Sequence, residues 1–199
     1  MRLEDAKKDH YRKLAKELGY RSRSAFKLIE LNKKYNLIKS NDNILDFGAA
    51  PGGWLQVSSK LVMPKGKVIG VDLLPIMPVE ENVTIFQGDI REKEVIERIL
   101  HEGKGKVDVV LSDMATNISG IWKIDHNNQI DLTMLIIDRF PELLEKNGSC
   151  LLKAFDGPEV SFTKSFSTLH GRVSSTQEDR ETAKRDLVYF EFLFDQLKV

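Results

Sequence analysis

The chain is poor in cysteine and has no long hydrophobic run. Cys150 is its only cysteine, so no disulfide can form within one chain. The apolar surroundings of Cys150, in residues 149–152, favour a buried small side chain over a reactive thiol. No apolar stretch approaches the roughly 20 residues of a membrane span, and the N-terminus lacks the apolar stretch of a secretory signal. We therefore expect a cytoplasmic protein with no membrane association.

An excess of charge of one sign is also missing. The 30 Lys and Arg residues balance 30 Asp and Glu residues, which argues against a generic polyanion-binding protein. The balance hides one asymmetry, because residues 1–27 hold nine basic residues against four acidic ones. A basic segment on a neutral body suits a partner held at one face, and a solvated amphipathic helix is the alternative.

Two familiar site signatures are absent from the sequence. The four histidines, His10, His101, His126 and His170, are scattered without the spacing of metal ligands, so we expect no metal site. The glycine-rich segment 48–53 does not fit the pattern G-x-G-x-x-G. This mismatch disfavours an NAD-dependent oxidoreductase.

Residues 44–54, Ile-Leu-Asp-Phe-Gly-Ala-Ala-Pro-Gly-Gly-Trp, are the most informative segment. An apolar run ends there in Asp46, small residues follow, and a helical pattern opens at Gly53. Such a strand-to-helix turn can press its backbone against a ligand, because side chains there would collide with it. Without a phosphate cradle, the loop suits a ligand that has no pyrophosphate, such as S-adenosylmethionine (SAM). An ordinary tight turn is the alternative.

Apolar segments of strand length alternate with helical patterns along the body of the chain. The alternation predicts an α/β fold with a doubly wound, mostly parallel sheet and helices on both faces. A charged loop without a helix-length apolar stretch precedes the last strand, which predicts one antiparallel strand. The expected strands are 43–47, 67–71, 83–87, 107–112, 149–155 and 187–194, and the expected helices lie near 24–31, 53–62, 91–102, 127–146 and 158–168.

Acidic residues lie in or just after the ends of four of the expected strands, at the carboxyl ends where ligands of open α/β sheets bind. These residues are Asp46, Asp72, Asp89 and Asp113. Asp72 lies 20 residues after Gly52, about where an acid meets ribose hydroxyls in nucleotide sites. The strand ends therefore predict a nucleoside site.

Lys153 lies within the fifth expected strand, in an otherwise apolar run. Burial of a lone cation is costly, so a lysine there is either paired or functional. The alternative is a lysine that reaches solvent from an edge strand. Because perturbed lysines gather at functional sites, we favour a functional role for Lys153.

These motifs, in this order, resemble those of the FtsJ/RlmE-type RNA 2′-O-ribose methyltransferases, from about Arg21 to about Tyr189. The glycine loop alone marks many SAM enzymes. Its combination with Ser-Arg-Ser-x-Phe-Lys-Leu, Ser-Asp-Met-Ala and a strand lysine is much more specific. The matching segments are 21–28, 46–54, 72–75, 87–89, 112–115 with Asn117, 119–120 and 153–155.

The resemblance implies a Rossmann-like SAM-dependent methyltransferase fold, with a seven-stranded sheet that has one antiparallel strand. It implies methylation of a ribose 2′-hydroxyl in RNA, most typically of a uridine in large-subunit (23S) ribosomal RNA. The expected partner is this RNA or the large ribosomal subunit, and we expect a monomer. We expect residues 1–22 to form a basic N-terminal extension that contacts RNA, and residues 23–199 to form the methyltransferase domain.

The family carries a catalytic Lys-Asp-Lys-Glu tetrad, and the resemblance places three of its members on Lys27, Asp113 and Lys153. Two residues compete for the fourth place. Glu181 keeps the family's spacing from a preceding serine pair, whereas Asp186 stands where the final strand begins. The loop that holds both residues departs from the family pattern, so the choice stays open.

The SAM-binding residues are expected on the glycine loop and at the strand ends. We expect Asp72 to bind the SAM ribose hydroxyls and Asp89 the adenine amino group. Asp46 either contacts the ligand or organises the loop by accepting backbone N–H groups. The full expected set is Asp46, Gly48, Gly52, Gly53, Trp54, Asp72, Asp89 and Asp113.

Methyl transfer to a ribose hydroxyl needs alignment of the reacting atoms and removal of the hydroxyl proton. Lys153 is the candidate base, Lys27 a second positive charge beside it, and Asp113 its orienting acid. Arg21, Arg23 and Lys27 are the expected RNA contacts. A tRNA ribose as the substrate, and a non-catalytic SAM- or RNA-binding module, are the alternatives.

Overall fold

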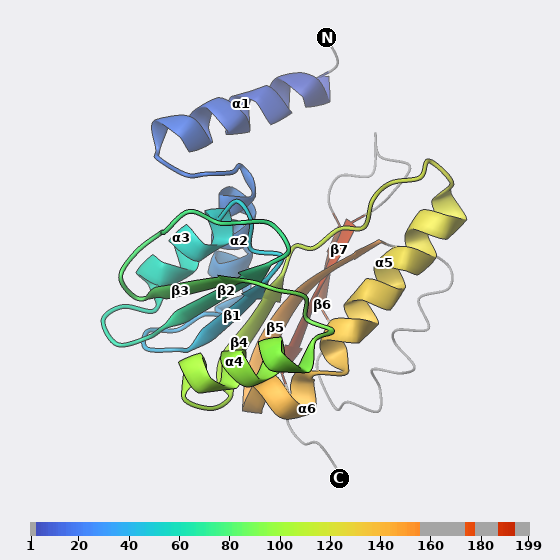
Figure 1. Cartoon of the computed structure of the whole chain (residues 1–199). Helices are drawn as coiled ribbons and strands as arrows, with labels where there is room; N and C mark the ends of the chain where they lie inside the picture. Colours follow the sequence, from blue (N-terminus) through green and yellow to red (C-terminus); the bar gives the residue numbers. More distant parts are fainter. Residues whose placement is uncertain (1–2, 156–173, 178–186, 194–199) are drawn as a thin grey trace. The chain divides into compact units, whose positions relative to one another are not determined.

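A computed structural model describes the backbone of residues 3–155, 174–177 and 187–193, and the side chains of residues 10–153 (Figure 1). The expected helix 158–168 and the residues Glu181 and Asp186 lie outside the described residues. The chain divides into two compact units, Met1–Asp89 and Ile90–Val199, and each is described by itself. None of the helices in the described part is long and apolar enough to cross a membrane.

The first unit is a three-stranded parallel sheet with helices packed beside it. Its strand order is β3-β2-β1, and both pairs of neighbours are parallel. Helix α3 packs on β1 and β2, and α2 packs on α3 (Figure 1). Its elements are α1 (Leu3–Glu17), α2 (Ser24–Tyr35), β1 (Ile44–Phe47), α3 (Gly53–Leu61), β2 (Val68–Asp72) and β3 (Val83–Gln87).

Strand β1 and most of β2 are buried, whereas β3 is largely half-buried. All four residues of β1 are buried, as the near-continuous apolar run of a covered parallel strand predicts. Gly70 on β2 allows α3 to come close, since a Cβ atom there would lie 2.8 Å from a methyl carbon of Leu55. Parallel pairing places the carboxyl ends of β1, β2 and β3 at one edge of this sheet.

The second unit joins parallel and antiparallel strands. Strand β5 pairs with β4 in parallel and with β7 in antiparallel orientation, and β6 pairs antiparallel with β7. Helix α5 packs on β5, and α4 contacts α6 (Figure 1). Its elements are α4 (Lys93–Gly103), β4 (Val107–Ser112), α5 (Trp122–Ile137), α6 (Phe140–Leu143), β5 (Leu144–Phe155), β6 (Ser174–Gln177) and β7 (Leu187–Leu193).

The prediction of one helix over 127–146 was wrong at both ends. Helix α5 already begins at Trp122, and it ends at Ile137. Pro141 follows at the start of the short helix α6, where its missing N–H could not have continued the hydrogen bonds of α5. Strand β5 then begins at Leu144, five residues before the expected strand 149–155. The apolar residues of this stretch suit a buried helix and a buried strand equally, so the pattern alone could not separate them.

Candidate active site

The glycine loop between β1 and α3 turns through two residues with positive φ. Gly48 has φ 72° and Gly52 has φ 105°, a region that costs glycine nothing and other residues much. The loop is tied back to β2, because the Gly48 N–H donates to the carbonyl oxygen of Val71 at 2.9 Å. The sequence therefore predicted the strand, the loop and the helix start in the right places.

Asp72, at the end of β2, joins the glycine loop to the segment that follows the strand. Its Oδ2 accepts the Ala50 N–H at 2.9 Å, and its Oδ1 accepts the Leu74 N–H at 2.8 Å. Each carboxylate oxygen keeps a second acceptor position, so the half-buried Asp72 can still bind two ligand hydroxyls. The exposed side chains of Leu73, Leu74 and Met77 lie on the same segment. An acid that can pair with a diol, beside exposed apolar side chains, fits a nucleoside.

Arg21 connects the same two segments from the N-terminal side. Its guanidinium donates to the carbonyl oxygens of Met77, at 2.6 Å, and of Pro78, and more weakly to that of Pro51 at 3.4 Å. A Cβ atom on Gly52 would lie 2.9 Å from Nη1 of Arg21. This side chain, predicted to contact RNA phosphates, thus holds the loops on both sides of Asp72.

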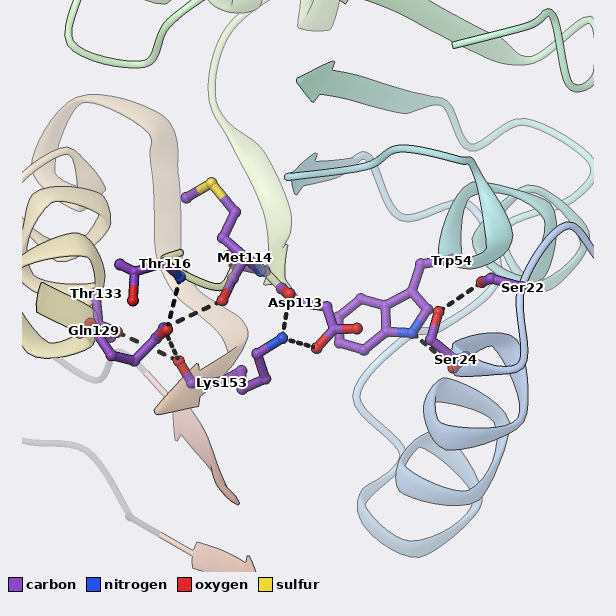
Figure 2. Close-up of polar contacts among 10 residues, drawn as sticks. Ser22, Ser24, Trp54, Asp113, Met114, Thr116, Gln129, Thr133 and Lys153 are labelled. Carbon is purple, nitrogen blue, oxygen red and sulfur yellow. Dashed lines mark hydrogen bonds and ion pairs between the residues drawn. The ribbon is translucent and has the colours of Figure 1, made fainter. Parts of the chain in front are cut away.

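Gly53 and Trp54 contact residues 22–24, where α2 begins. A Cβ atom on Gly53 would lie 2.1 Å from the Ser22 hydroxyl oxygen, so only glycine allows this approach. The buried indole of Trp54 donates its N–H to the carbonyl oxygen of Ser24 at 2.8 Å (Figure 2). Both residues were predicted to bind SAM, and the structure gives both a part in joining α3 to residues 22–24.

The remaining predicted residues of the first unit are distributed around its sheet edge and α2. Asp46 is buried within β1, and Asp89 is half-buried after β3. Lys27 is half-buried on α2, and Arg23 is exposed just before that helix. The two cations stand four residues apart at the start of α2.

Lys153 and Asp113 form an ion pair in the second unit. The Lys153 Nζ donates to Asp113 Oδ1 at 2.7 Å and also to the Asp113 backbone carbonyl oxygen (Figure 2). The Lys153 side chain is 11% exposed and that of Asp113 26%. These two acceptors fix the direction of the amine and leave one of its three N–H positions for a further partner.

The backbone of Lys153 is held by two buried side chains of α5. The β4·β5 ladder ends at the pair Ser112–Leu152, so the next β5 carbonyl needs a different partner. Gln129 Nε2 donates to the Lys153 carbonyl oxygen at 3.2 Å. The Thr133 hydroxyl lies 3.3 Å from the same oxygen and shares its hydrogen with the Gln129 backbone carbonyl oxygen at 2.8 Å. Sequence reasoning did not identify these two residues.

Gln129 also holds the loop that follows Asp113. Its Nε2 donates to the Met114 carbonyl oxygen at 3.1 Å, and its Oε1 accepts the Thr116 N–H at 3.3 Å (Figure 2). One buried amide therefore positions both backbone segments that carry the Lys153–Asp113 pair. The spacing of Asp125, Gln129 and Thr133, four residues apart on one helix face, is the signal that could have identified them.

A family model of the FtsJ-like methyltransferases matches residues 20–185, which is most of the chain. The chain belongs to the FtsJ-like methyltransferase family. The match includes all the predicted site residues except Asp186, among them the Asp72 carboxylate and the Lys153–Asp113 pair. In the part of the chain whose side chains are described, no group of His, Cys, Asp and Glu is placed to hold a metal ion.

Relatives of this FtsJ-like methyltransferase carry the name ribosomal RNA large subunit methyltransferase E. The protein from Methanococcus aeolicus is 47% identical over 152 residues, which is 76% of this chain and 56% of the relative. That from Coxiella burnetii is 47% identical over 163 residues, 79% of this chain and 76% of the relative. The chain thus spans little more than half the length of the first relative.

One solved structure supports the family, and a second supports the fold. A Plasmodium falciparum protein described as a ribosomal RNA methyltransferase superposes with a TM-score of 0.77 at 30% identity, covering 88% of this chain and 98% of that one. Fibrillarin from Aeropyrum pernix, solved with S-adenosyl-L-methionine bound, superposes with a TM-score of 0.56 at 17% identity, covering 79% of this chain and 68% of that one. The second likeness shows the α/β fold alone.

Proposed function

We propose that this FtsJ-like methyltransferase transfers the methyl group of SAM to a ribose 2′-hydroxyl of RNA, specifically of a uridine in 23S ribosomal RNA. The observation that carries the proposal is the Lys153–Asp113 ion pair at the carboxyl end of β4. An amine held by two oxygen atoms, with one position left, is arranged to meet a hydroxyl group. The names of the relatives support ribosomal RNA as the substrate.

SAM fits the glycine loop and Asp72. The carboxylate of Asp72 would accept the two ribose hydroxyls, while Asp89 would meet the adenine amino group. Gly48 and Gly52 keep the loop free of side chains, and the first turn of α3 offers backbone N–H groups to a carboxylate. When bound, SAM supplies an activated methyl group on sulfur. We include Asp46, Gly53, Trp54 and Asp113 in this site as residues that shape it.

Lys153 acts as the base in this proposal, and Asp113 orients it. Asp113 holds the amine in one direction through two acceptors. To act as the base, the amine is neutral: its two N–H groups donate to Asp113, and the lone pair at its third position accepts the proton of the 2′-hydroxyl. Proton removal of this kind contributes about 10²–10⁴-fold to rate when the geometry is right. Lys27 supplies a second positive charge, and either Glu181 or Asp186 completes the tetrad.

RNA is proposed to bind at the basic segment, with Arg23 and Lys27 on the phosphate backbone. Arg23 is exposed and Lys27 half-buried, and both lie at the start of α2. Arg21 has less support as a phosphate contact, because its guanidinium already donates to backbone carbonyl oxygens. Residues 1–22 would extend this surface from the methyltransferase domain 23–199.

The proposed fold is the seven-stranded SAM-dependent methyltransferase sheet with one antiparallel strand. The pairings within each unit support it, because β7 is the strand that runs opposite to its neighbours β5 and β6. We propose a monomer that acts in the cytoplasm on ribosomal RNA or the large ribosomal subunit.

Transfer of tritium from labelled SAM to total RNA and to isolated large ribosomal subunits tests the function. We expect transfer to a single ribose of 23S ribosomal RNA with the wild-type protein. We expect none with Lys153→Ala, which should still bind SAM with the wild-type Kd in calorimetry. Transfer to tRNA would establish the other substrate, and SAM binding without transfer would establish a non-catalytic module. Full single-turnover activity of a folded Lys153→Ala variant would exclude Lys153 as the base.

A further inference from the structure

An apolar patch lies on the loop after β4 and the first turn of α5. The loop patch consists of Ile118, Ile121, Trp122 and Ile124, which are all exposed, Ile118 at 66% and Trp122 at 36%. Single exposed apolar residues are normal on protein surfaces, whereas four within seven residues mark a surface that another molecule covers.

The loop patch is held rigidly although it is exposed. The buried carboxylate of Asp125 accepts the Ser119 N–H and the Ser119 hydroxyl, both at 2.7 Å, and the Gly120 N–H at 3.3 Å. Gln129 accepts the Thr116 N–H on the other side of Ile118. These bonds order the loop in advance, so a partner would meet side chains that are already in place.

Trp122 is the aromatic centre of the loop patch. Its indole stacks on the ring of His126, with centroids 4.7 Å apart and planes 10° apart. His126 is buried, and among the described residues neither of its ring nitrogens has a hydrogen-bond partner. His126 therefore acts as a flat support that fixes the plane of a partly exposed indole.

The loop patch lies on the chain segment that begins at the candidate catalytic pair. The loop starts at Asp113, whose carboxylate binds Lys153, and Gln129 joins the loop backbone to the Lys153 carbonyl oxygen. Residues 114–124 contain no Asp or Glu and one basic residue, the exposed Lys123. Because these residues carry no carboxylate that would repel phosphate groups, the surface suits a polyanion that also has flat apolar rings.

We propose that the loop patch binds unpaired nucleobases of the RNA substrate next to the target nucleotide, with one base stacked on Trp122. This inference rests on the proposed function. Bases of single-stranded RNA are recognised by stacking on aromatic side chains, and a fixed indole on the loop that starts at Asp113 would hold a base near the reacting ribose. The patch selects single-stranded over double-stranded RNA, because bases in a duplex are not free to stack on protein.

Binding of labelled single-stranded oligouridine RNA, measured by fluorescence anisotropy, tests the patch. We expect Trp122→Ala to raise the Kd by about 5- to 100-fold and Trp122→Phe to restore most of the affinity. A duplex of the same length should bind with a Kd that neither change affects. Met63→Ala, which removes an apolar side chain of 52% exposure in the other unit, should leave every Kd unchanged.

Tryptophan fluorescence gives a second readout that needs no variant of doubtful folding. The protein has two tryptophans, Trp54 and Trp122, and Trp54 is buried. We expect single-stranded RNA to quench the wild-type emission, and we expect no quenching in Trp122→Phe. If Trp122→Ala does not fold, Ile118→Ser combined with Ile121→Ser replaces it in the anisotropy assay.

The outcomes separate this inference from the proposed function. Wild-type methyl transfer together with an unchanged Kd and KM for RNA in Trp122→Ala would overturn the loop patch and leave the function in place. Trp122-dependent RNA binding without methyl transfer would support the patch and refute the function. Self-association or protein binding that needs Trp122, with RNA affinity unchanged, would overturn the inference in favour of a protein partner.

Discussion

Replacement of Arg21 by alanine should weaken SAM binding, because it removes hydrogen bonds that hold the loops around the proposed site. The change removes two short hydrogen bonds, to the carbonyl oxygens of Met77 and Pro78, and one long bond to that of Pro51. A bond from a charged donor contributes about 1.5–3 kcal/mol when it is buried, and partial exposure lowers this contribution considerably. We therefore expect Arg21→Ala to cost about 1–2 kcal/mol in total.

The change should also lower the affinity for SAM. The carbonyl groups that lose their donor lie on the glycine loop and on the segment after β2, and Asp72 joins these two segments. If the whole of this free energy is lost from the loop conformation that binds SAM, the Kd for SAM rises about 5- to 30-fold. Isothermal titration calorimetry measures this Kd, and thermal unfolding measures the loss of stability. Arg21→Lys should behave almost like the alanine variant, since an ammonium group cannot bridge two carbonyl groups as a planar fork does.

Arg23→Ala is the matched control, because Arg23 is an exposed arginine two residues away. It should leave SAM affinity unchanged and lower the salt slope of RNA binding by roughly one unit. The opposite result would refute the reasoning: an Arg21→Ala variant with wild-type stability and SAM affinity, but with a salt slope reduced as much as in Arg23→Ala, would make Arg21 a phosphate contact.

Three further predictions concern other contacts of the site. Asp72→Ala should weaken SAM binding by roughly 10- to 150-fold, because it removes a charged acceptor worth about 1.5–3 kcal/mol. Unchanged SAM affinity in calorimetry would exclude Asp72 from the site. Gly53→Ala should lower the melting temperature, although alanine normally stabilises a helix by up to about 1 kcal/mol relative to glycine. Adding Ser22→Gly should restore the melting temperature, because it removes the hydroxyl and Cβ that the new methyl group meets. A Gly53→Ala single variant with a raised melting temperature would contradict the close approach. Gln129→Leu should remove the donor of the Met114 carbonyl oxygen and leave the Lys153 carbonyl oxygen only its longer contact with Thr133. We expect a cost of about 1–3 kcal/mol in urea unfolding and a kcat that falls more than the KM for SAM rises. Wild-type stability and kcat would show that Gln129 does not position Lys153.

Much of the candidate site could be predicted from the sequence because the decisive patterns are local. A strand, a glycine turn and a helix start follow one another within residues 44–54, and each has its own steric signature. The acid at the end of β2 and the lysine in β5 stand out against apolar neighbours. The C-terminal end of helix α5 could not be predicted from the sequence. The apolar residues after Ile137 suit a continued helix, a separate helical turn or the start of β5 equally well.

The sequence by itself determined the alternating α/β order, the glycine loop and the residues at the strand ends, because backbone sterics and hydrophobic period act over a few residues. Only the tertiary structure decided which side chains meet. The Lys153–Asp113 pair joins residues 40 apart, and the Arg21 bond to Met77 joins residues 56 apart. Such pairings arise when packing brings distant segments together and buried polar groups must each find a partner. For the same reason Gln129 takes its place beneath Lys153, where β4 has ended and a backbone carbonyl requires a donor.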